Sequence, residues 1–378
     1  MRDLIEMRGR LVQTDAVVRG RVLIEDGFIT AVEHEDQLTT DLRGPEPLIA
    51  PGFVDVHVHG WGGHDAMGGV AELAAMAGAL ARRGVTSFLP TAVSAPIERL
   101  VAFATSVKAW SQDVAVGGAA PLGYNLEGPF LAPSRRGAHD PDALLSPSDV
   151  DAPVLAPLLD GLRLITVAPE LSGAIDLIRR LRRHGVVVSL GHSAATLDEA
   201  SAGYDAGATG TTHLFNAMTG IDHRAPGLAV AALMGDDAFV EVIADGQHVH
   251  PALLRLIWRT KRPAHVVLVS DAIALGGLGD GRTRLGSLDV EVSGGRATLA
   301  GTATLAGSVI ALDDAVRTSV AAGIPLPSAI AAASTYPLAL IGQTDRGRIA
   351  VGQRADLVEL DEGLAVRSVW LAGRRLDA

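Results

Sequence analysis

The middle of the chain alternates short apolar runs with longer stretches in which alanine and leucine recur at helical spacing. A short apolar run bounded by glycine or proline is typical of a buried strand, and the longer stretches favour helices. Eight strand–helix units predict an α/β fold with a closed TIM (β/α)8 barrel rather than an open sheet. The expected strands are Phe53–Val58, Ser87–Leu89, Gly123–Leu126, Leu164–Val167, Val186–Leu190, Gly210–Thr212, Val240–Ala244 and Val266–Ser270.

The two ends of the chain have a different pattern. Both alternate apolar and polar positions between glycines, which is the period of a strand. We therefore expect residues 1–50 and 345–378 to form one small β-sandwich domain, and residues 51–344 to form the barrel domain. Past the eighth strand, the pattern predicts a hairpin turning at Gly294–Gly295 and helices at Ser308–Ala322 and Pro327–Ser334.

Composition narrows the chemistry that this protein can perform. The chain has no cysteine, which excludes disulfides, thiolate ligands and cysteine nucleophiles, so imidazole and carboxylate must hold any metal. No apolar run approaches the roughly 20 residues of a spanning helix, and the start lacks an apolar leader, so we expect a cytoplasmic protein without a membrane partner. A net charge of −11 without a basic cluster argues against nucleic acid.

Chemistry-bearing residues follow five of the expected strands. In a TIM barrel the active site lies at the C-terminal strand ends, and residues two apart on a strand point to the same side. His57 and His59 can therefore reach one ion together. Imidazole and carboxylate groups without sulfur favour zinc or another divalent ion with open positions. The six residues at this rim are His57, His59, Glu127, His192, His213 and Asp271.

Each of these residues also has an ordinary interpretation. A lone pair of alternate histidines is commonly exposed or hydrogen-bonded, Glu127 or Asp271 can cap a helix, and His192 or His213 can be a core histidine. All six nevertheless follow a predicted strand and none lies in a predicted helix, which favours one shared metal site. The histidines without such placement are interpreted as ordinary: His34, His64, His184, His223, His250 and His265.

Six motifs in a fixed order resemble the amidohydrolase superfamily and, in detail, the N-acetylglucosamine-6-phosphate deacetylases. They are PGFVDVHVHG, NLEGPF, GHS, THLFNAM, ADGQHVH and SDA, and the closing GRIAVGQRADLVELD extends the likeness nearly end to end. The resemblance implies a metal-dependent hydrolase that converts N-acetylglucosamine 6-phosphate into glucosamine 6-phosphate and acetate. It also implies that Glu127, His192 and His213 hold the principal ion, that the strand-one histidines leave a second ion possible, and that Asp271 shuttles the proton.

The resemblance further supplies the expected substrate contacts. Arg224 and His248 match phosphate-binding positions, at least one of which is contributed by the neighbouring subunit in family dimers, so a homodimer is expected. An arginine fork binds phosphate bidentately, and a dianion would otherwise be repelled by an acidic protein. The alternative for Arg224 is a surface salt bridge. The full expected set is Ala138, His139, Asn216, Ala217, Arg224, His248, Leu305 and Ala306.

Three rival functions remain open. Cyclic-amide hydrolases of the dihydroorotase or hydantoinase type commonly bridge two metals with a modified lysine at the end of strand four, but here that strand ends in ITVAPE and Glu127 takes the bridging position. Adenosine-type deaminases have a glutamate beside the strand-five histidine, which SLGHSAAT lacks. A barrel that serves only as a binding scaffold should have lost ligands, and all six rim residues are present.

Overall fold

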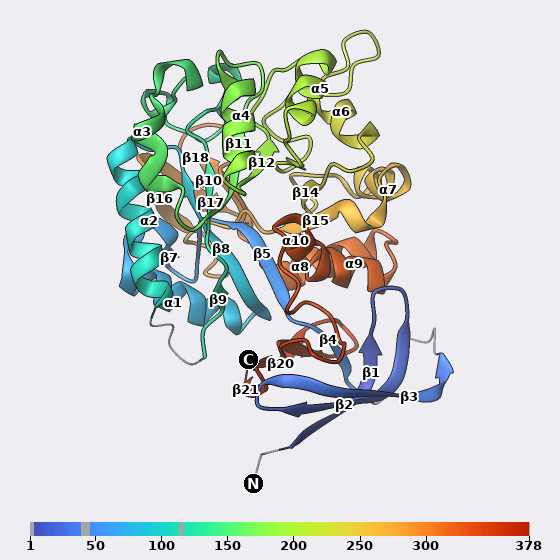
Figure 1. The fold of residues 1–378 in the computed structure, drawn as a ribbon. Coiled ribbons are helices and arrows are strands. Elements are labelled where there is room, and N and C mark those ends of the chain that lie inside the picture. Colours follow the sequence, from blue (N-terminus) through green and yellow to red (C-terminus); the bar gives the residue numbers. More distant parts are fainter. Residues whose placement is uncertain (1–3, 39–45, 113–116, 378) are drawn as a thin grey trace.

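Both ends of the chain lie in one seven-stranded sheet at the bottom of the molecule (Figure 1). The structure is a computed structural model that describes residues 4–38, 46–112 and 117–377. The strand order is β21-β20-β19-β4-β1-β2-β3, and only the pair of β1 and β4 is parallel. The strands are β1 (Ile5–Val12), β2 (Val17–Glu25), β3 (Phe28–Leu38), β4 (Leu48–Pro51), β19 (Leu357–Leu360), β20 (Val366–Leu371) and β21 (Arg374–Asp377).

The pairing of the two chain ends agrees with the alternating pattern of the sequence. Hydrogen bonds join the seven strands of the chain ends into a single sheet. The sequence led us to expect a sandwich of two sheets. Strand β4 ends at Pro51, and Gly52 alone separates it from the next strand. The division into residues 1–50 with 345–378 and residues 51–344 stays a prediction.

The eight predicted strands all exist, and they run parallel at the centre of the larger part. Six of them form a curled sheet in chain order, and the remaining two pair with each other. The first six are β5 (Phe53–Val58), β8 (Val85–Val93), β10 (Tyr124–Glu127), β11 (Leu162–Val167), β12 (Val187–Leu190) and β13 (Gly210–Thr211), and the pair is β14 (Val240–Ile243) and β15 (Val266–Val269). Their parallel half-barrel confirms the α/β architecture.

Backbone hydrogen bonds join the two parallel sheets at both seams, among them that of Thr211 N to Phe239 O at 2.9 Å. Phe239 N donates to Thr209 O over 2.8 Å between β13 and β14, and Asp271 N donates to His57 O over 2.9 Å between β15 and β5. No strand ladder is assigned at either seam within the described residues. Complete closure into a TIM barrel therefore stays a prediction.

Helices follow most of the parallel strands and cover the outside of the curled sheet (Figure 1). Helix α1, for example, buries Leu73, Met76, Ala77 and Leu80 at the period of an amphipathic helix. The α-helices are α1 (Val70–Ala81), α2 (Ile97–Ser111), α3 (Ala152–Leu155), α4 (Ala174–Arg183), α5 (Leu197–Asp205), α6 (Leu228–Met234), α7 (Pro251–Thr260), α8 (Leu312–Ala321), α9 (Leu326–Ala332) and α10 (Thr335–Leu340).

Short elements complete the connections. The predicted hairpin at Gly294–Gly295 is confirmed as the turn between β17 and β18 of a small antiparallel sheet. That sheet consists of β16 (Gly281–Leu285), β17 (Leu288–Ser293) and β18 (Arg296–Leu299). Three two-residue strands and six 3-10 helices remain: β6 (Gly60–Trp61), β7 (His64–Asp65), β9 (Ala120–Pro121), η1 (Ala66–Gly68), η2 (Pro133–Arg135), η3 (Pro141–Ala143), η4 (Pro147–Asp149), η5 (Ala156–Leu158) and η6 (Pro263–His265).

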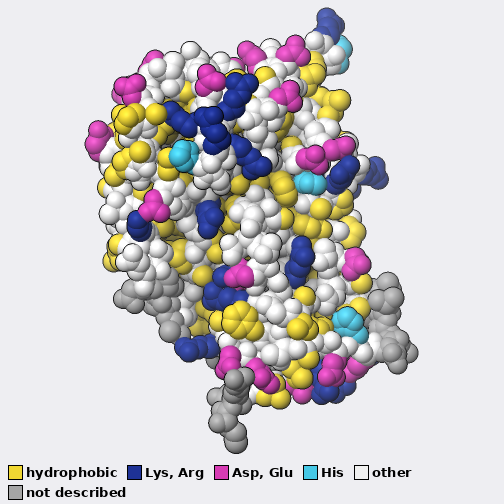
Figure 2. Space-filling view, viewed as in Figure 1, with side chains coloured by type: hydrophobic (Ala, Val, Ile, Leu, Met, Phe, Trp, Pro, Cys, Tyr) yellow, Lys and Arg dark blue, Asp and Glu magenta, His cyan; other side chains and the backbone are white. Residues whose placement is uncertain are grey.

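One basic cluster corrects the sequence analysis. Lysine and arginine side chains gather over α4 on the face shown in Figure 2, and the last turn of this helix holds Arg180, Arg182 and Arg183. The carboxyl end of a helix carries a partial negative charge, which favours cations in this position.

None of the described helices is long and apolar enough to cross a membrane.

Candidate active site

The fold brings all six rim residues together. His57 lies in β5, Glu127 is the last residue of β10, and Asp271 follows β15 closely. His59, His192 and His213 likewise stand just past the ends of β5, β12 and β13. All six residues are buried, at 7% exposure or less. Their meeting follows from the parallel arrangement, because the carboxyl ends of parallel strands face one rim.

The backbone at this rim is strained. Among the described residues, φ is positive at eight that are not glycine, and five of these lie at the rim: His192 (46°), His213 (28°), Phe215 (78°), Ala217 (48°) and Asp271 (49°). Such a conformation costs on the order of 1–3 kcal/mol for a residue with a Cβ and persists only when the surroundings enforce it. The strand ends therefore turn sharply in order to present these side chains to one another.

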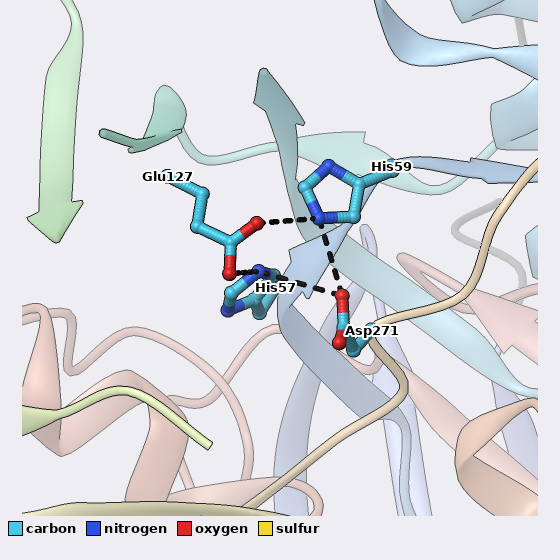
Figure 3. A group of neighbouring side chains, drawn as sticks. All are labelled: His57, His59, Glu127 and Asp271. Atoms are coloured by element: carbon cyan, nitrogen blue, oxygen red, sulfur yellow. Dashed lines mark ion pairs between the residues drawn. The ribbon is translucent and has the colours of Figure 1, made fainter. Parts of the chain in front are cut away.

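Four side chains form the first group of possible metal ligands (Figure 3). His59 Nε2 lies 3.2 Å from Glu127 Oε2 and 3.1 Å from Asp271 Oδ1. His57 Nε2 lies 3.6 Å from both Glu127 Oε1 and Asp271 Oδ1. Each of the four residues offers one ligand atom within 4.8 Å of the other three. This geometry suits a small cation held by two imidazoles and two carboxylates.

Glu127 also faces a second group of histidines. Its Oε1 lies 2.9 Å from both His192 Nε2 and His213 Nε2, and these two nitrogens are 3.0 Å apart. Its Oε2 lies 3.1 Å from His139 Nε2. Glu127, His139 and His192 form the second group whose ligand atoms lie within 4.8 Å of one another. The carboxylate of Glu127 therefore stands between two possible ion positions.

Burial and opposite charge compete in setting the pKa values of this cluster. Burial lowers the pKa of a histidine and raises that of an acid. Burial lowers the pKa of His59, but the hydrogen bonds and negative charges of Asp271 and Glu127 have the larger combined effect and raise it to about 9. Burial would raise the pKa of Glu127, but the surrounding histidines lower it well below its usual range. At His192 the effect of burial is larger than that of Glu127, and the pKa falls to about 4.

These residues fit a divalent cation. His57 Nε2 is buried and has no hydrogen-bond partner among the described residues, although it points at two carboxylates. A buried ring nitrogen without a hydrogen-bond partner, beside two buried anions, marks a position that a cation can fill. Where the pKa of a histidine is raised, as at His59, the ion would have to displace a proton.

Glu241 is a site residue that the sequence analysis missed. It lies in β14, is 1% exposed, and its Oε2 lies 3.0 Å from His57 Nδ1. A carboxylate behind a metal-binding histidine fixes the ring and raises its basicity. The signal was available in the sequence, since Glu241 is the one charged residue in the apolar strand VEVI. The sequence analysis considered residues at and just after the strand ends, whereas Glu241 is the second residue of its strand.

A cavity of about 280 Å³ opens beside the cluster, and its walls include most of the expected substrate contacts. Six expected contacts line it: Ala138, His139, Asn216, Ala217, His248 and Leu305. Ala306 is fully buried and does not line it. Arg224 also lies outside the lining, on an exposed loop where its Nε donates to His223.

Four further residues in the cavity wall were not expected: Gly137, Leu285, Thr304 and Gly307. Leu285 ends strand β16, and Thr304 follows the same small antiparallel sheet. This sheet therefore forms one wall of the cavity. Sequence reasoning predicted the hairpin but gave no signal that it folds back over the strand ends.

The rim, the cavity and the parallel sheet together match a known family. The family model described as "Amidohydrolase family" matches residues 48–376, so the chain belongs to the amidohydrolase family.

Relatives that match over nearly the whole chain are more specific. A human N-acetylglucosamine-6-phosphate deacetylase is 40% identical, covering 97% of this chain and 92% of the relative. An Escherichia coli O157:H7 protein named N-acetylgalactosamine-6-phosphate deacetylase is 38% identical, covering 99% of both chains.

Solved structures agree with these relatives. The N-acetylglucosamine-6-phosphate deacetylase of Thermotoga maritima has a TM-score of 0.91 at 32% identity, and the coverage is 100% of both chains. A Mycobacterium smegmatis enzyme of the same name, solved as an aspartate-to-alanine variant in complex with N-acetyl-D-glucosamine 6-phosphate, has a TM-score of 0.90 at 36% identity, again with complete coverage.

Proposed function

We propose that this protein hydrolyses N-acetylglucosamine 6-phosphate to glucosamine 6-phosphate and acetate. The observation that carries the proposal is the buried cluster of histidines with Glu127 and Asp271, beside a cavity large enough for a small sugar. Full-length similarity to enzymes of this name supports the same substrate class.

Asp271 performs the proton transfers in this reaction. Its carboxylate lies at the cavity wall, and His59 and His57 lower its pKa against the effect of burial, so it is ionised at neutral pH. Asp271 takes a proton from the attacking water as the new C–O bond forms. It then gives that proton to the amine nitrogen as the C–N bond breaks. A divalent cation bound at the rim would supply Lewis acidity and make water more acidic.

Zinc is the proposed metal, with one or two ions per subunit. His57, His59, Glu127 and Asp271 would hold one ion, and Glu127, His192 and His213 the other. The support is the chemistry of the donors, since imidazole and carboxylate without sulfur suit zinc.

A homodimer completes the phosphate end of the proposed site. His248 lies at the cavity wall, whereas Arg224 is exposed and outside it, so Arg224 would act in the cavity of a second subunit. Exposed apolar side chains near Arg224 and on α6 support such an interface, with Ile221 at 53% and Met234 at 73% exposure. Arginine is suited to this role because its fork binds phosphate bidentately.

The structure argues against a cyclic-amide hydrolase, because such enzymes commonly use a modified lysine to bridge two metals. The sequence has two lysines, and both lie in described parts of the chain. Lys108, in the last turn of α2, pairs with Asp160, and Lys261 donates to Ala232 O. Neither lines the cavity, so a bridging modified lysine is absent.

Two further features, barrel closure and location in the cell, belong to the same proposal. The parallel strands act as one closed TIM barrel, which the hydrogen bonds at both seams support. The protein works in the cytoplasm, where a chain without cysteine needs no oxidising environment.

A coupled assay for acetate tests the substrate. Acetate release is measured from N-acetylglucosamine with and without the 6-phosphate, while bound metal is counted in the same preparation. We expect strong preference for the phosphorylated sugar. A preference for the neutral sugar, or no acetate from either sugar, would refute the proposal. Because one relative is named for the galactosamine epimer, N-acetylgalactosamine 6-phosphate is the second substrate to assay.

A further inference from the structure

The histidines around Glu127 differ in what faces their second ring nitrogen. A neutral imidazole carries one proton, and it resides on whichever nitrogen faces an acceptor. A metal ligand needs a lone pair at the nitrogen that points to the cation, whereas a hydrogen-bond donor needs the proton there. The partner of Nδ1 therefore decides what Nε2 can do.

Three rim histidines present Nδ1 to an acceptor. In the neutral ring, which a cation would require, the proton is held at Nδ1 and the Nε2 that points at the carboxylates keeps a lone pair. This is the form that binds a metal. The pairs are His57 Nδ1 with Glu241 Oε2 at 3.0 Å, His59 Nδ1 with Thr91 O at 3.2 Å, and His192 Nδ1 with Arg135 O at 2.8 Å.

His139 differs from these three because a donor faces its Nδ1, whereas His213 Nδ1 has no hydrogen-bond partner among the described residues. The backbone nitrogen of Ser94 lies 3.2 Å from His139 Nδ1, and Ser94 Oγ lies 2.9 Å from the same atom. A backbone N–H only donates, so His139 Nδ1 must be the acceptor and the proton must reside on Nε2. His139 Nε2 lies 3.1 Å from Glu127 Oε2, an acceptor that this N–H satisfies. His139 thus stands among possible ligands in the wrong tautomer for a ligand.

Ser94 is itself held firmly. It follows β8 directly and is 4% exposed. Its hydroxyl also lies 3.3 Å from Glu127 O, and a Cβ added at Gly128 would overlap Ser94 Oγ. The amide that faces His139 is therefore fixed by packing on both sides.

We propose that Ser94 is a positioning residue. Its backbone N–H holds His139 with the proton on Nε2, which keeps His139 out of the metal ligand set and leaves at the cavity wall an N–H that Glu127 Oε2 accepts until the carbonyl oxygen of a bound substrate takes its place. The role toward the amide rests on the proposed function, whereas the tautomer does not. A donor in this place stabilises the negative charge that develops on the oxygen as water attacks, without giving up its proton.

Nitrogen-15 NMR of the full-length protein with labelled histidine tests the tautomer. Signals of His139 are identified by their absence in His139→Gln. We expect His139 to be protonated at Nε2 and His192, as internal control, at Nδ1. Ser94→Ala retains the amide and should retain the His139 pattern. A proton on His139 Nδ1 in the wild type, or a reversed pattern in Ser94→Ala, would overturn the proposal.

Metal counting with kinetics tests the role. His139→Gln should keep the wild-type metal content and lose roughly 10²–10³-fold in kcat, the usual loss for one oxyanion donor, with a smaller change in KM. His192→Gln, the matched variant of a proposed ligand, should lose metal. Loss of metal from His139→Gln would overturn the proposal. If no acetylated sugar phosphate is hydrolysed, the proposed function fails, while the NMR and metal results still decide the tautomer.

Discussion

The rim of the parallel strands and the seven-stranded sheet of the chain ends use charged residues in opposite ways. In the sheet, Arg8 pairs with Glu35 at the surface, where the side chains are 66% and 48% exposed. At the rim, the side chains of Glu127 and Asp271 are 5% and 10% exposed and face histidines. Water screens the surface pair, so it adds little stability. The rim charges have left water and require one another or a cation.

The backbones of the two regions differ in the same way. The remaining positive φ values outside glycine are at Asp26, Leu364 and Ala372, which lie in turns between paired strands of the terminal sheet. Such turns need this conformation for their geometry. At the rim, a positive φ at His192, His213 and Asp271 directs the functional side chains toward one another. Similar strain thus serves chain reversal in one region and chemistry in the other.

Removing a rim histidine should have the largest effect. His213→Ala takes away a nitrogen 2.9 Å from Glu127 Oε1, so the variant should lose bound metal and fall to background activity while staying folded. His34→Ala, on exposed strand β3, is the control and should change neither quantity. Metal analysis and circular dichroism check both variants. Full activity in a metal-free variant would exclude metal dependence.

Replacing the proposed proton carrier should come next. Asp271→Asn keeps the shape but cannot accept a proton, so kcat should fall by roughly 10²–10⁴-fold. Substrate KM should change little, because the cavity walls remain. Steady-state kinetics with metal content held equal measure this effect. A near-normal kcat would mean that another group moves the proton.

Glu241→Gln should weaken the metal site from behind. Loss of the carboxylate that faces His57 Nδ1 should lower metal affinity by roughly 10–100-fold. Asp313→Asn is the matched control, because Asp313 is also buried but pairs with Arg83, away from the rim. Competition with a chelator measures both affinities. Equal losses in the two variants would show a general effect of buried charge.

Arg224→Ala should act on the phosphorylated substrate alone. Loss of a charge-assisted hydrogen bond costs on the order of 1.5–3 kcal/mol, which lowers kcat/KM by about tenfold or more. Activity on the unphosphorylated sugar should hardly change. Mixing Arg224→Ala subunits with Asp271→Asn subunits should restore some activity only if the arginine crosses a dimer interface. An equal loss with both sugars would make Arg224 structural.

The smallest effect is expected beside the terminal sheet, at Asp345. Hydrogen bonding to Arg346 lowers the pKa of this acid to about 2, so the folded state favours its charged form. Its contribution to stability is therefore present above the ordinary pKa of about 3.9 and is lost as the pH falls toward 2. The stability deficit of Asp345→Asn should shrink across this window in urea unfolding. A deficit that is constant with pH would contradict the assignment.

The strands were predictable because they are short, apolar and separated by helices, so each signal is local. Val85–Val93 was underestimated as Ser87–Leu89, since Pro90 and the polar residues within it interrupt the apolar run although all nine positions are buried. The rim residues were predictable because they stand immediately after those strands. Glu241 is conspicuous in the sequence as the one charged residue of an apolar strand, but only the folded sheet shows that its side chain reaches His57.

The sequence by itself determined the strand–helix alternation, the six rim residues and the absence of cysteine chemistry, because composition and local spacing carry this information. Only the tertiary structure decided which histidine nitrogen faces a donor or an acceptor, since Ser94, Thr91 and Arg135 lie 45, 32 and 57 residues from the histidines that they face. It also decided that Arg224 stays outside the cavity and that the β16–β18 sheet closes one wall. Contacts between distant segments depend on packing, which local patterns do not encode.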